Sequence, residues 1–145
     1  LRQIELAKRR RLPIVVHCRE AYADCLAILR ESAPLRGVAH CFSGNAKTAE
    51  EMVALGFHIS FAGPLTFPSA RCLREVAAAV PQDRILIETD CPWLAPQPVR
   101  GKRNEPACVR FVAEELARLR GRTLEGTAET TTANARAAFG ITVGP

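Results

Sequence analysis

Three short apolar runs in the sequence each end in side chains that could bind a metal ion. His17 closes the run "LPIVVH" and His40 closes the run "GVAH". A third run, "RILI", leads directly into Glu88 and, two residues later, Asp90. Imidazole nitrogen and carboxylate oxygen suit zinc and its neighbours among the divalent cations, and such a set leaves coordination positions open for water. His17, His40 and Asp90 therefore form a candidate divalent-metal site.

A cysteine directly follows each of these three residues, so a thiolate site is the alternative. Side chains in a strand alternate between its two faces. Cys18 and Cys41 should therefore point away from the face that carries the histidines. Cys91 lies beyond its strand, where the alternation is a weaker guide. We interpret these cysteines as small buried hydrophobic residues that pack outward against helices.

The cysteines of the chain are expected to be reduced thiols rather than a disulfide framework. The six cysteines include no C-x-x-C pair, and a chain of 145 residues can bury a core without disulfides. Reduced thiols are typical of the cytosol. The N-terminus has no signal-peptide pattern, and the longest apolar runs are far too short to span a bilayer. We therefore expect a cytoplasmic protein with no membrane partner.

A second candidate element is the basic loop "PQPVRGKRNEP", residues 96–106, which lies shortly after Asp90. Arg100, Lys102 and Arg103 are crowded ahead of a predicted helix that begins near Asn104–Pro106. Guanidinium groups and helix N-termini both attract phosphate. The alternative is an ordinary solvated loop with an asparagine cap. The net charge of +5 fits a phosphate-bearing partner without requiring one.

Three further features could serve function or structure: Trp93, His58 and the cluster Lys8–Arg11. Trp93 could stack on a base, although a single tryptophan more often serves packing. His58 lies at the start of its predicted strand, so we interpret it as a structural or exposed residue at the end opposite the candidate ligands. The basic cluster Lys8–Arg11 fits the solvated C-terminus of a helix better than a nucleic-acid patch.

The apolar pattern predicts strands that alternate with helices along the whole chain. The predicted strands are 12–17, 37–40, 57–61 and 84–88, and the helices are 20–33, Asn45 to Gly56, Ser69 to Pro81, 105–120 and about 123–139. Strands that are apolar on both faces and alternate with helices indicate a parallel α/β sheet. Four such strands could form a small open sheet or half of an eight-stranded barrel, which needs about 250 residues. The position of the polar residues at the C-terminal strand ends favours the barrel.

Four consecutive blocks of the sequence resemble one known family. They are "LPIVVHCREA", "GVAHCFSGNAKTAEEMVALGFHISFAGPLTF", "VPQDRILIETDCPWLAPQPVRGKRNEPACV" and "TTANARAAFG". In this order they resemble the TatD-type metal-dependent deoxyribonucleases, which are amidohydrolase-like TIM barrels, from about Gln3 to Phe139. The resemblance implies the C-terminal half of a (β/α)8 barrel. Residues 1–145 would then be a single partial domain that lacks the N-terminal half-barrel.

The resemblance also implies a set of site residues and a reaction. His17, His40 and Asp90 match metal ligands of the family, and Asp90 also matches the residue that binds or activates the attacking water. Two divalent cations per complete site are implied, with Zn²⁺, Mg²⁺ or Mn²⁺ as the possibilities, and DNA as the substrate. Paired cations would bridge the phosphate, lower the pKa of a bound water and stabilise the leaving oxygen. The residues expected to face the substrate are Arg19, Ser43, Arg100, Lys102 and Asn104.

The sequence departs from the family at the N-terminal side. The family carries an H-x-H motif on its first strand and a bridging glutamate on a later N-terminal strand, whereas the histidines of this chain are His17, His40 and His58. The chain also lacks an initiator methionine and starts inside a predicted helix. We therefore expect a piece of a longer protein, whose other half-barrel is needed in cis or in trans. Two alternatives stay open: a barrel hydrolase for another ester, amide or lactone, and a catalytically incomplete fragment that binds metal or nucleic acid.

Overall fold

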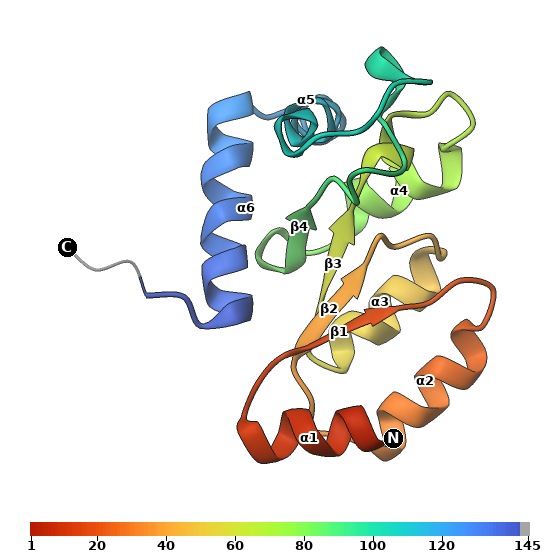
Figure 1. The fold of residues 1–145 in the computed structure, drawn as a ribbon, viewed down its shortest axis with the longest axis vertical. Helices are drawn as coiled ribbons and strands as arrows, with labels where there is room; N and C mark the ends of the chain where they lie inside the picture. Colours follow the sequence, from red (N-terminus) through yellow and green to blue (C-terminus); the bar gives the residue numbers. More distant parts are fainter. Residues whose placement is uncertain (143–145) are drawn as a thin grey trace.

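A computed structural model describes residues 1–142 of the chain, and Figure 1 shows its parallel sheet with helices packed around it. The regular elements follow one another as α1 (Arg2–Arg10), β1 (Ile14–His17), α2 (Tyr22–Glu31), β2 (Gly37–His40), α3 (Ala46–Ala54), β3 (Phe57–Phe61), α4 (Arg71–Ala79), β4 (Ile85–Ile87), α5 (Val109–Arg120) and α6 (Leu124–Phe139). Short 3₁₀ turns lie at Gly63–Thr66, Gln82–Arg84, Gln97–Val99 and Pro106–Cys108. The predicted alternation of strands and helices is confirmed.

The four strands form one sheet in the order β1-β2-β3-β4, and every neighbouring pair is parallel. Each crossover between the parallel strands contains a helix, the usual form of such a connection. The register pairs His17 with His40 at the C-terminal ends of β1 and β2. The Glu88 backbone N–H continues the ladder beyond β4 by donating to the Phe61 carbonyl, at 2.9 Å. The C-terminal ends of the strands therefore lie side by side at the same end of the sheet.

One face of the sheet packs against the helices and forms the core. Phe57, Ile59 and Phe61 of β3 alternate with residues of the other face, and all three are fully buried. They belong to one cluster with Met52 of α3 and Leu116 of α5. Period-2 alternation in β3 thus buries its large side chains under the helices and leaves the other face for different residues.

The opposite face of the sheet carries the polar strand-end residues and is covered only in part. Val38 and Leu86 are buried there against Ala138 of α6. On the edge strand β1, Val15 is 52% exposed, so the prediction of a buried strand over 12–17 is wrong at this position. The reason is that β1 has a neighbour on one side only, and α6 does not reach across to it. The second edge is at β4.

Local sequence sets most helix ends where they were predicted. Asn45 caps α3 by accepting a hydrogen bond from the Thr48 N–H, at 2.9 Å. Gly121 and Gly140 end α5 and α6 with φ of 61° and 65°, a left-handed conformation that suits glycine. The predicted cap at Ser69 is wrong. The Ala70 N–H donates to the Phe67 carbonyl, so Ser69 lies inside a turn and the helix begins at Arg71.

Across residues 1–142, no helix combines the length and the apolar character needed to cross a bilayer.

His58 is a structural residue at the N-terminal side of the sheet. It is buried and lines a cavity of about 310 Å³ together with Arg36, Asp83 and Arg84. Burial, followed by the charge of Arg84, lowers the pKa of the imidazole, while Asp83 and backbone hydrogen bonds act in the opposite direction. The interpretation of His58 as structural agrees with this burial and with its place away from the candidate ligands.

Stability is expected to fall in mild acid because of His58. Its pKa in the folded chain lies below the ordinary value of 6.5, so the unfolded chain binds more protons between these two values. The free energy of unfolding should therefore be highest above about pH 6.5 and decrease as the pH drops below it. Urea unfolding at a series of pH values measures the slope, and His58→Gln should flatten it. An unchanged slope in His58→Gln would contradict this assignment.

Candidate metal centre

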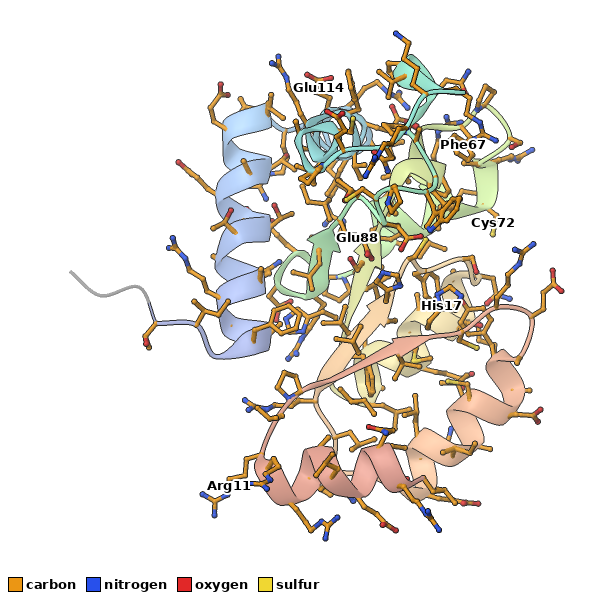
Figure 2. All side chains as sticks on the ribbon, in the orientation of Figure 1. Arg11, His17, Phe67, Cys72, Glu88 and Glu114 are labelled. Atoms are coloured by element: carbon orange, nitrogen blue, oxygen red, sulfur yellow. The ribbon has the colours of Figure 1, made fainter. Side chains whose placement is uncertain are left out.

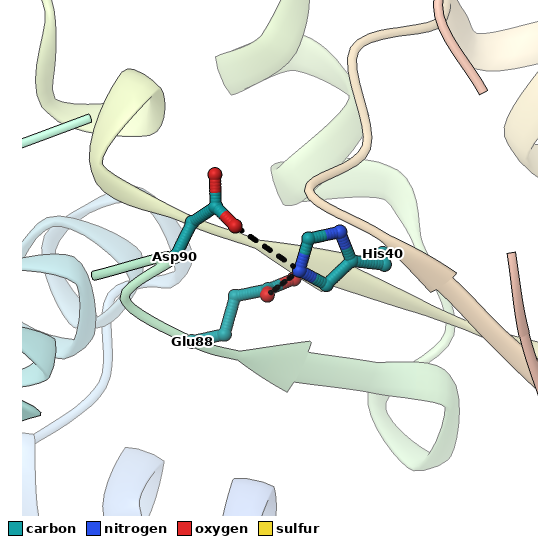
Figure 3. Close-up of side chains that lie close together, drawn as sticks. All are labelled: His40, Glu88 and Asp90. Atoms are coloured by element: carbon teal, nitrogen blue, oxygen red, sulfur yellow. Dashed lines mark ion pairs between the residues drawn. The ribbon is translucent and has the colours of Figure 1, made fainter. Parts of the chain in front are cut away.

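Three side chains converge where strands β2 and β4 end, as Figure 3 shows. The Nε2 atom of His40 lies 2.6 Å from Glu88 Oε2 and 3.4 Å from Asp90 Oδ1. Each residue offers one ligand atom, and these atoms all lie within 4.8 Å of one another. All three residues are partly exposed, so the cluster is open to small molecules from solution.

The donor set fits a divalent cation. Two carboxylates face a single imidazole nitrogen, so a proton on Nε2 can serve one of them, whereas a cation can serve all three groups at once. Imidazole nitrogen with carboxylate oxygens is a ligand combination that zinc and manganese accept, and three protein ligands leave positions for water. His40, Glu88 and Asp90 could therefore hold one cation.

Glu88 has a second contact that fixes its orientation. Its Oε1 atom accepts a hydrogen bond from the Cys41 backbone N–H at 2.7 Å, while Oε2 faces His40. The carboxylate thus ties the segment after β2 to the segment after β4. Such support of a ligand by a neighbouring group is what keeps metal sites in shape. The sequence reasoning noted Glu88 beside Asp90 but did not select it, and its spacing of two residues from Asp90 was the available signal.

Backbone conformation helps to aim the cluster. Cys41 and Asp90 have φ of 44° and 56°, in the left-handed region that residues other than glycine rarely adopt. Cys41 directly follows His40, and Asp90 is itself a member of the cluster. Each of them turns the chain just after a strand. Unusual backbone conformations of this kind occur often at functional sites. Here they let the chain reverse direction while the polar side chains stay at the sheet edge.

His17 lies next to this cluster but not within it. Figure 2 shows His17 and Glu88 at the ends of strands β1 and β4. The rings of His17 and His40 have their centroids 5.8 Å apart, and His17 is exposed. The imidazole of His17 therefore faces the open side of the site. A second cation bound there would need further ligands besides His17.

Two predicted substrate residues lie on the loops that follow β1 and β2. Arg19 is exposed, and its side chain approaches the Glu20 carboxylate at 3.9 Å. Ser43 is exposed as well, and both its backbone N–H and its hydroxyl contact the Tyr22 hydroxyl, at 3.0 and 3.2 Å. Both side chains lie beside strand ends that carry candidate ligands. Neither contacts the cluster directly.

The basic loop and the turn at residues 90–94 both contribute residues to one groove. Residues Pro92–Ala95 and Arg100–Arg103 line this groove, whose volume is about 730 Å³. The guanidinium of Arg100 stacks over the ring of Phe67, 3.9 Å from its centroid. Within the described part of the chain, no carboxylate pairs with Arg100, Lys102 or Arg103. These charges are therefore free to meet an anion.

Asn104 has a different position from the one expected for a substrate residue. It is only 2% exposed, and its Nδ2 donates to the carbonyls of Thr89 and Trp93 at 2.7 and 2.6 Å. Its Oδ1 accepts from the Glu105 N–H at 3.0 Å, and its own N–H donates to the Pro92 carbonyl. The side-chain amide is fully used inside the protein. Asn104 therefore holds the segment around Asp90 and does not face a substrate.

Replacing Asn104 by alanine is expected to destabilise the chain by about 2–4 kcal/mol. The change would leave the partly buried carbonyls of Thr89 and Trp93 without their donor and would empty the buried site of the Asn104 side chain, and both losses are costly. Chemical denaturation measures the loss. Lys102→Ala on the same loop is the matched control and should change stability by less than about 0.5 kcal/mol. Equal stability of the two variants would contradict this account.

The cysteines are all free, as predicted, but they do not share one environment. Cys18 and Cys41 are buried, in agreement with packing. Burial, together with the nearby Glu88 and Asp90 carboxylates, raises the pKa of the Cys41 thiol to about 12. The interpretation as buried residues is wrong for Cys91, which is exposed because it follows the turn at Asp90 rather than a strand.

Comparison with known proteins identifies relatives along nearly the whole chain. A family model described as TatD related DNase matches residues 1–140. The chain is 48% identical to the uncharacterized metal-dependent hydrolase YabD of Bacillus subtilis over 141 residues, which cover 96% of this chain and 55% of that protein. It is 37% identical to the 3'-5' ssDNA/RNA exonuclease TatD of Erwinia amylovora, over 96% of this chain and 56% of that protein.

A solved structure resembles the fold over the same extent. The TatD homologue YjjV from Escherichia coli superposes with a TM-score of 0.90 at 32% identity, over 97% of this chain and 54% of that one. The chain thus spans about half the length of the relatives it matches. The family model, the curated relatives and the fold agree with one another. This chain belongs to the TatD family of metal-dependent hydrolases.

Proposed function

We propose that the chain is part of a TatD-type phosphodiesterase that hydrolyses DNA with two divalent cations. The observation that carries this proposal is the convergence of His40, Glu88 and Asp90 at the strand ends. A groove is lined by residues that follow Asp90 closely in the chain, and among residues 1–142 its basic side chains have no acidic partner. Cation ligands beside a basic groove are what the cleavage of a phosphate ester requires.

The residues of the cluster have distinct roles in this proposal. His17 and His40 would each offer a ring nitrogen to a cation, and Asp90 a carboxylate oxygen. Divalent cations held there would polarise a phosphoryl oxygen and lower the pKa of the attacking water. The Asp90 carboxylate would accept a hydrogen bond from that water and orient it. Glu88 would keep His40 in place through Oε1, which accepts the hydrogen bond from the N–H of the next residue, Cys41.

The substrate would be held by basic and polar groups around the cluster. Lys102 and Arg100 would neutralise phosphates on the groove side, and Arg19 would do so after β1. Ser43, after β2, would donate a hydrogen bond to a phosphate oxygen. Asn104 acts only indirectly, because its amide is occupied by backbone carbonyls. Such contacts make binding fall with increasing salt, since counterions are released from the nucleic acid.

The complete site would need a second half-barrel, supplied in cis or in trans. The chain spans about half of its relatives' length, and the sheet has open edges at β1 and β4. We propose that residues 1–145 are the C-terminal half of a (β/α)8 barrel, and that further strands bring the remaining ligands. The isolated 145-residue chain would then hydrolyse DNA weakly or not at all. It would bind fewer than two cations tightly, which metal analysis of the purified chain can measure.

A substrate panel tests the reaction. Single-stranded DNA, duplex DNA, RNA, a nitrophenyl carboxylic ester and a lactone are offered with Mg²⁺, Mn²⁺ or Zn²⁺, with chelator as the blank. We expect metal-dependent cleavage of DNA; the Erwinia amylovora relative, by its name, acts on single-stranded DNA and RNA. Cleavage restricted to the carboxylic ester or the lactone would replace this proposal by a barrel hydrolase of different specificity.

A further inference from the structure

The only tryptophan of the chain stands exposed beside the metal cluster. Trp93 is 73% exposed, the largest exposed fraction among the aromatic side chains that the structure describes, and Phe139 follows at 42%. It is three residues after Asp90, and its backbone N–H donates to the Asp90 carbonyl at 3.0 Å. A tryptophan that serves packing would lose most of its exposed area. Trp93 instead lines the groove formed by Pro92–Ala95 and Arg100–Arg103.

The backbone beneath this indole is held on several sides. The Asn104 backbone N–H donates a hydrogen bond to the Pro92 carbonyl, and its Nδ2 donates one to the Trp93 carbonyl. The next residue, Leu94, has φ of 53°, and its carbonyl lies so close to Gly63 that a Cβ there would collide with it. These contacts hold the backbone of the turn in place, while the Trp93 side chain that it carries stays exposed. A rigid backbone with an accessible aromatic ring loses little entropy when a ligand stacks on it.

The same groove is also lined by positive charge. Arg100, Gly101, Lys102 and Arg103 line it, and the Arg100 guanidinium is already ordered by the ring of Phe67. A ligand in this groove therefore meets both an aromatic ring and cations. A polynucleotide carries both complements, with a flat base and a phosphate in each unit.

We propose that Trp93 is a stacking site for a nucleobase, and that Arg100, Lys102 and Arg103 bind the phosphates of the same strand. This site deepens the proposed function, on which it rests, by assigning the residue that would hold an unpaired base of the substrate strand. Bases inside a duplex already stack on one another and present no free face to a protein ring. An exposed indole therefore selects unpaired bases near the cluster.

Intrinsic fluorescence reports on this site alone, because Trp93 is the single tryptophan. The 145-residue chain is titrated in chelator with a short oligothymidylate, with an abasic oligomer of equal length, and with a duplex. We expect the oligothymidylate to quench the fluorescence and the abasic oligomer to bind without quenching. Equal quenching by the abasic oligomer or by the duplex would overturn the stacking site, as would the absence of any binding.

Substitutions measure the contribution of the ring by anisotropy of a labelled oligothymidylate. Trp93→Ala should weaken binding roughly 5- to 150-fold, the range for the loss of one base–aromatic stack. Trp93→Phe should weaken it less, and Phe139→Ala, which removes an exposed ring on α6, should leave it unchanged. Equal affinity of Trp93→Ala and the unchanged chain would overturn the proposal.

Hydrolysis is scored separately with metal present. Base-dependent quenching without hydrolysis in any form of the protein would keep the stacking site and overturn the proposed reaction. Hydrolysis of DNA without base-dependent quenching would do the reverse.

Discussion

Replacing Asp90 by asparagine is expected to lower the metal affinity of the site by more than about 100-fold. Asp90 Oδ1 lies 3.4 Å from His40 Nε2, so the change removes one of the two negative charges that face the imidazole. Even groups that only support a metal ligand contribute about 10- to 100-fold in affinity, and a carboxylate that binds the cation directly should contribute more. Calorimetric titration of the 145-residue chain with Zn²⁺ or Mn²⁺ measures the effect.

In the complete protein, with both half-barrels present, the same change should reduce metal-dependent hydrolysis by about a thousandfold or more. Losing a single donor to the reacting oxygen costs an enzyme about 10²- to 10³-fold, and Asp90 is proposed to serve both the cation and the water. Cys91→Ser is the matched control, because Cys91 is the next residue, is exposed and has no proposed role in the reaction. Retention of full metal affinity in Asp90→Asn would sink the assignment of Asp90 as a ligand.

The order of effects within the cluster separates ligands from supporting groups. His40→Ala removes the nitrogen on which both carboxylates converge, so its loss of affinity should match that of Asp90→Asn. Glu88→Gln keeps an oxygen that can accept from the Cys41 N–H but loses the charge, so a smaller loss follows if Glu88 mainly orients His40. A loss as large as that of Asp90→Asn would instead make Glu88 a direct ligand.

The fold could be predicted from the sequence because local patterns mark each of its elements. The five residues of β3 alternate between core and opposite face, Asn45 caps its helix, and Gly121 and Gly140 end theirs. The Ser69 cap failed because a turn at Phe67–Ala70 competes with it. The exposure of Val15 was also missed, since it depends on the absence of a neighbouring strand beside β1.

The residue types of the site were readable, but their roles were not. Glu88 acquires its orientation from the Cys41 N–H, which lies 47 residues away in the sequence. Asn104 looked like a helix cap in a basic loop that faces phosphate, and only the fold brings the carbonyls of Thr89 and Trp93 onto its amide. Contacts between distant loops decide whether a polar side chain faces a ligand or holds the backbone.

The open sheet edges lead to the second large prediction, a gain of activity on completion of the barrel. The test is to fuse the part of Bacillus subtilis YabD that precedes its matched 55% to the N-terminus of this chain. At 48% identity in the matched part, the new interface should meet surfaces close to its own. We expect the fusion to bind two cations per chain and to hydrolyse DNA at least about 100 times faster than the 145-residue chain, because added ligands complete the two-metal site.

Structure and chemistry can be separated in this experiment. New strands at the edges should protect β1 and bury Val15, so the free energy of unfolding should rise together with activity. The fusion that carries Asp90→Asn is the control: it should show the same gain in stability with no gain in hydrolysis. If that control hydrolyses DNA as fast as the unchanged fusion, the borrowed segment acts without the His40, Glu88 and Asp90 cluster. The unchanged fusion could instead be more stable than the 145-residue chain but bind no additional cation and hydrolyse DNA no faster. The low activity of the chain would then be caused by its own ligands and not by a missing half-barrel.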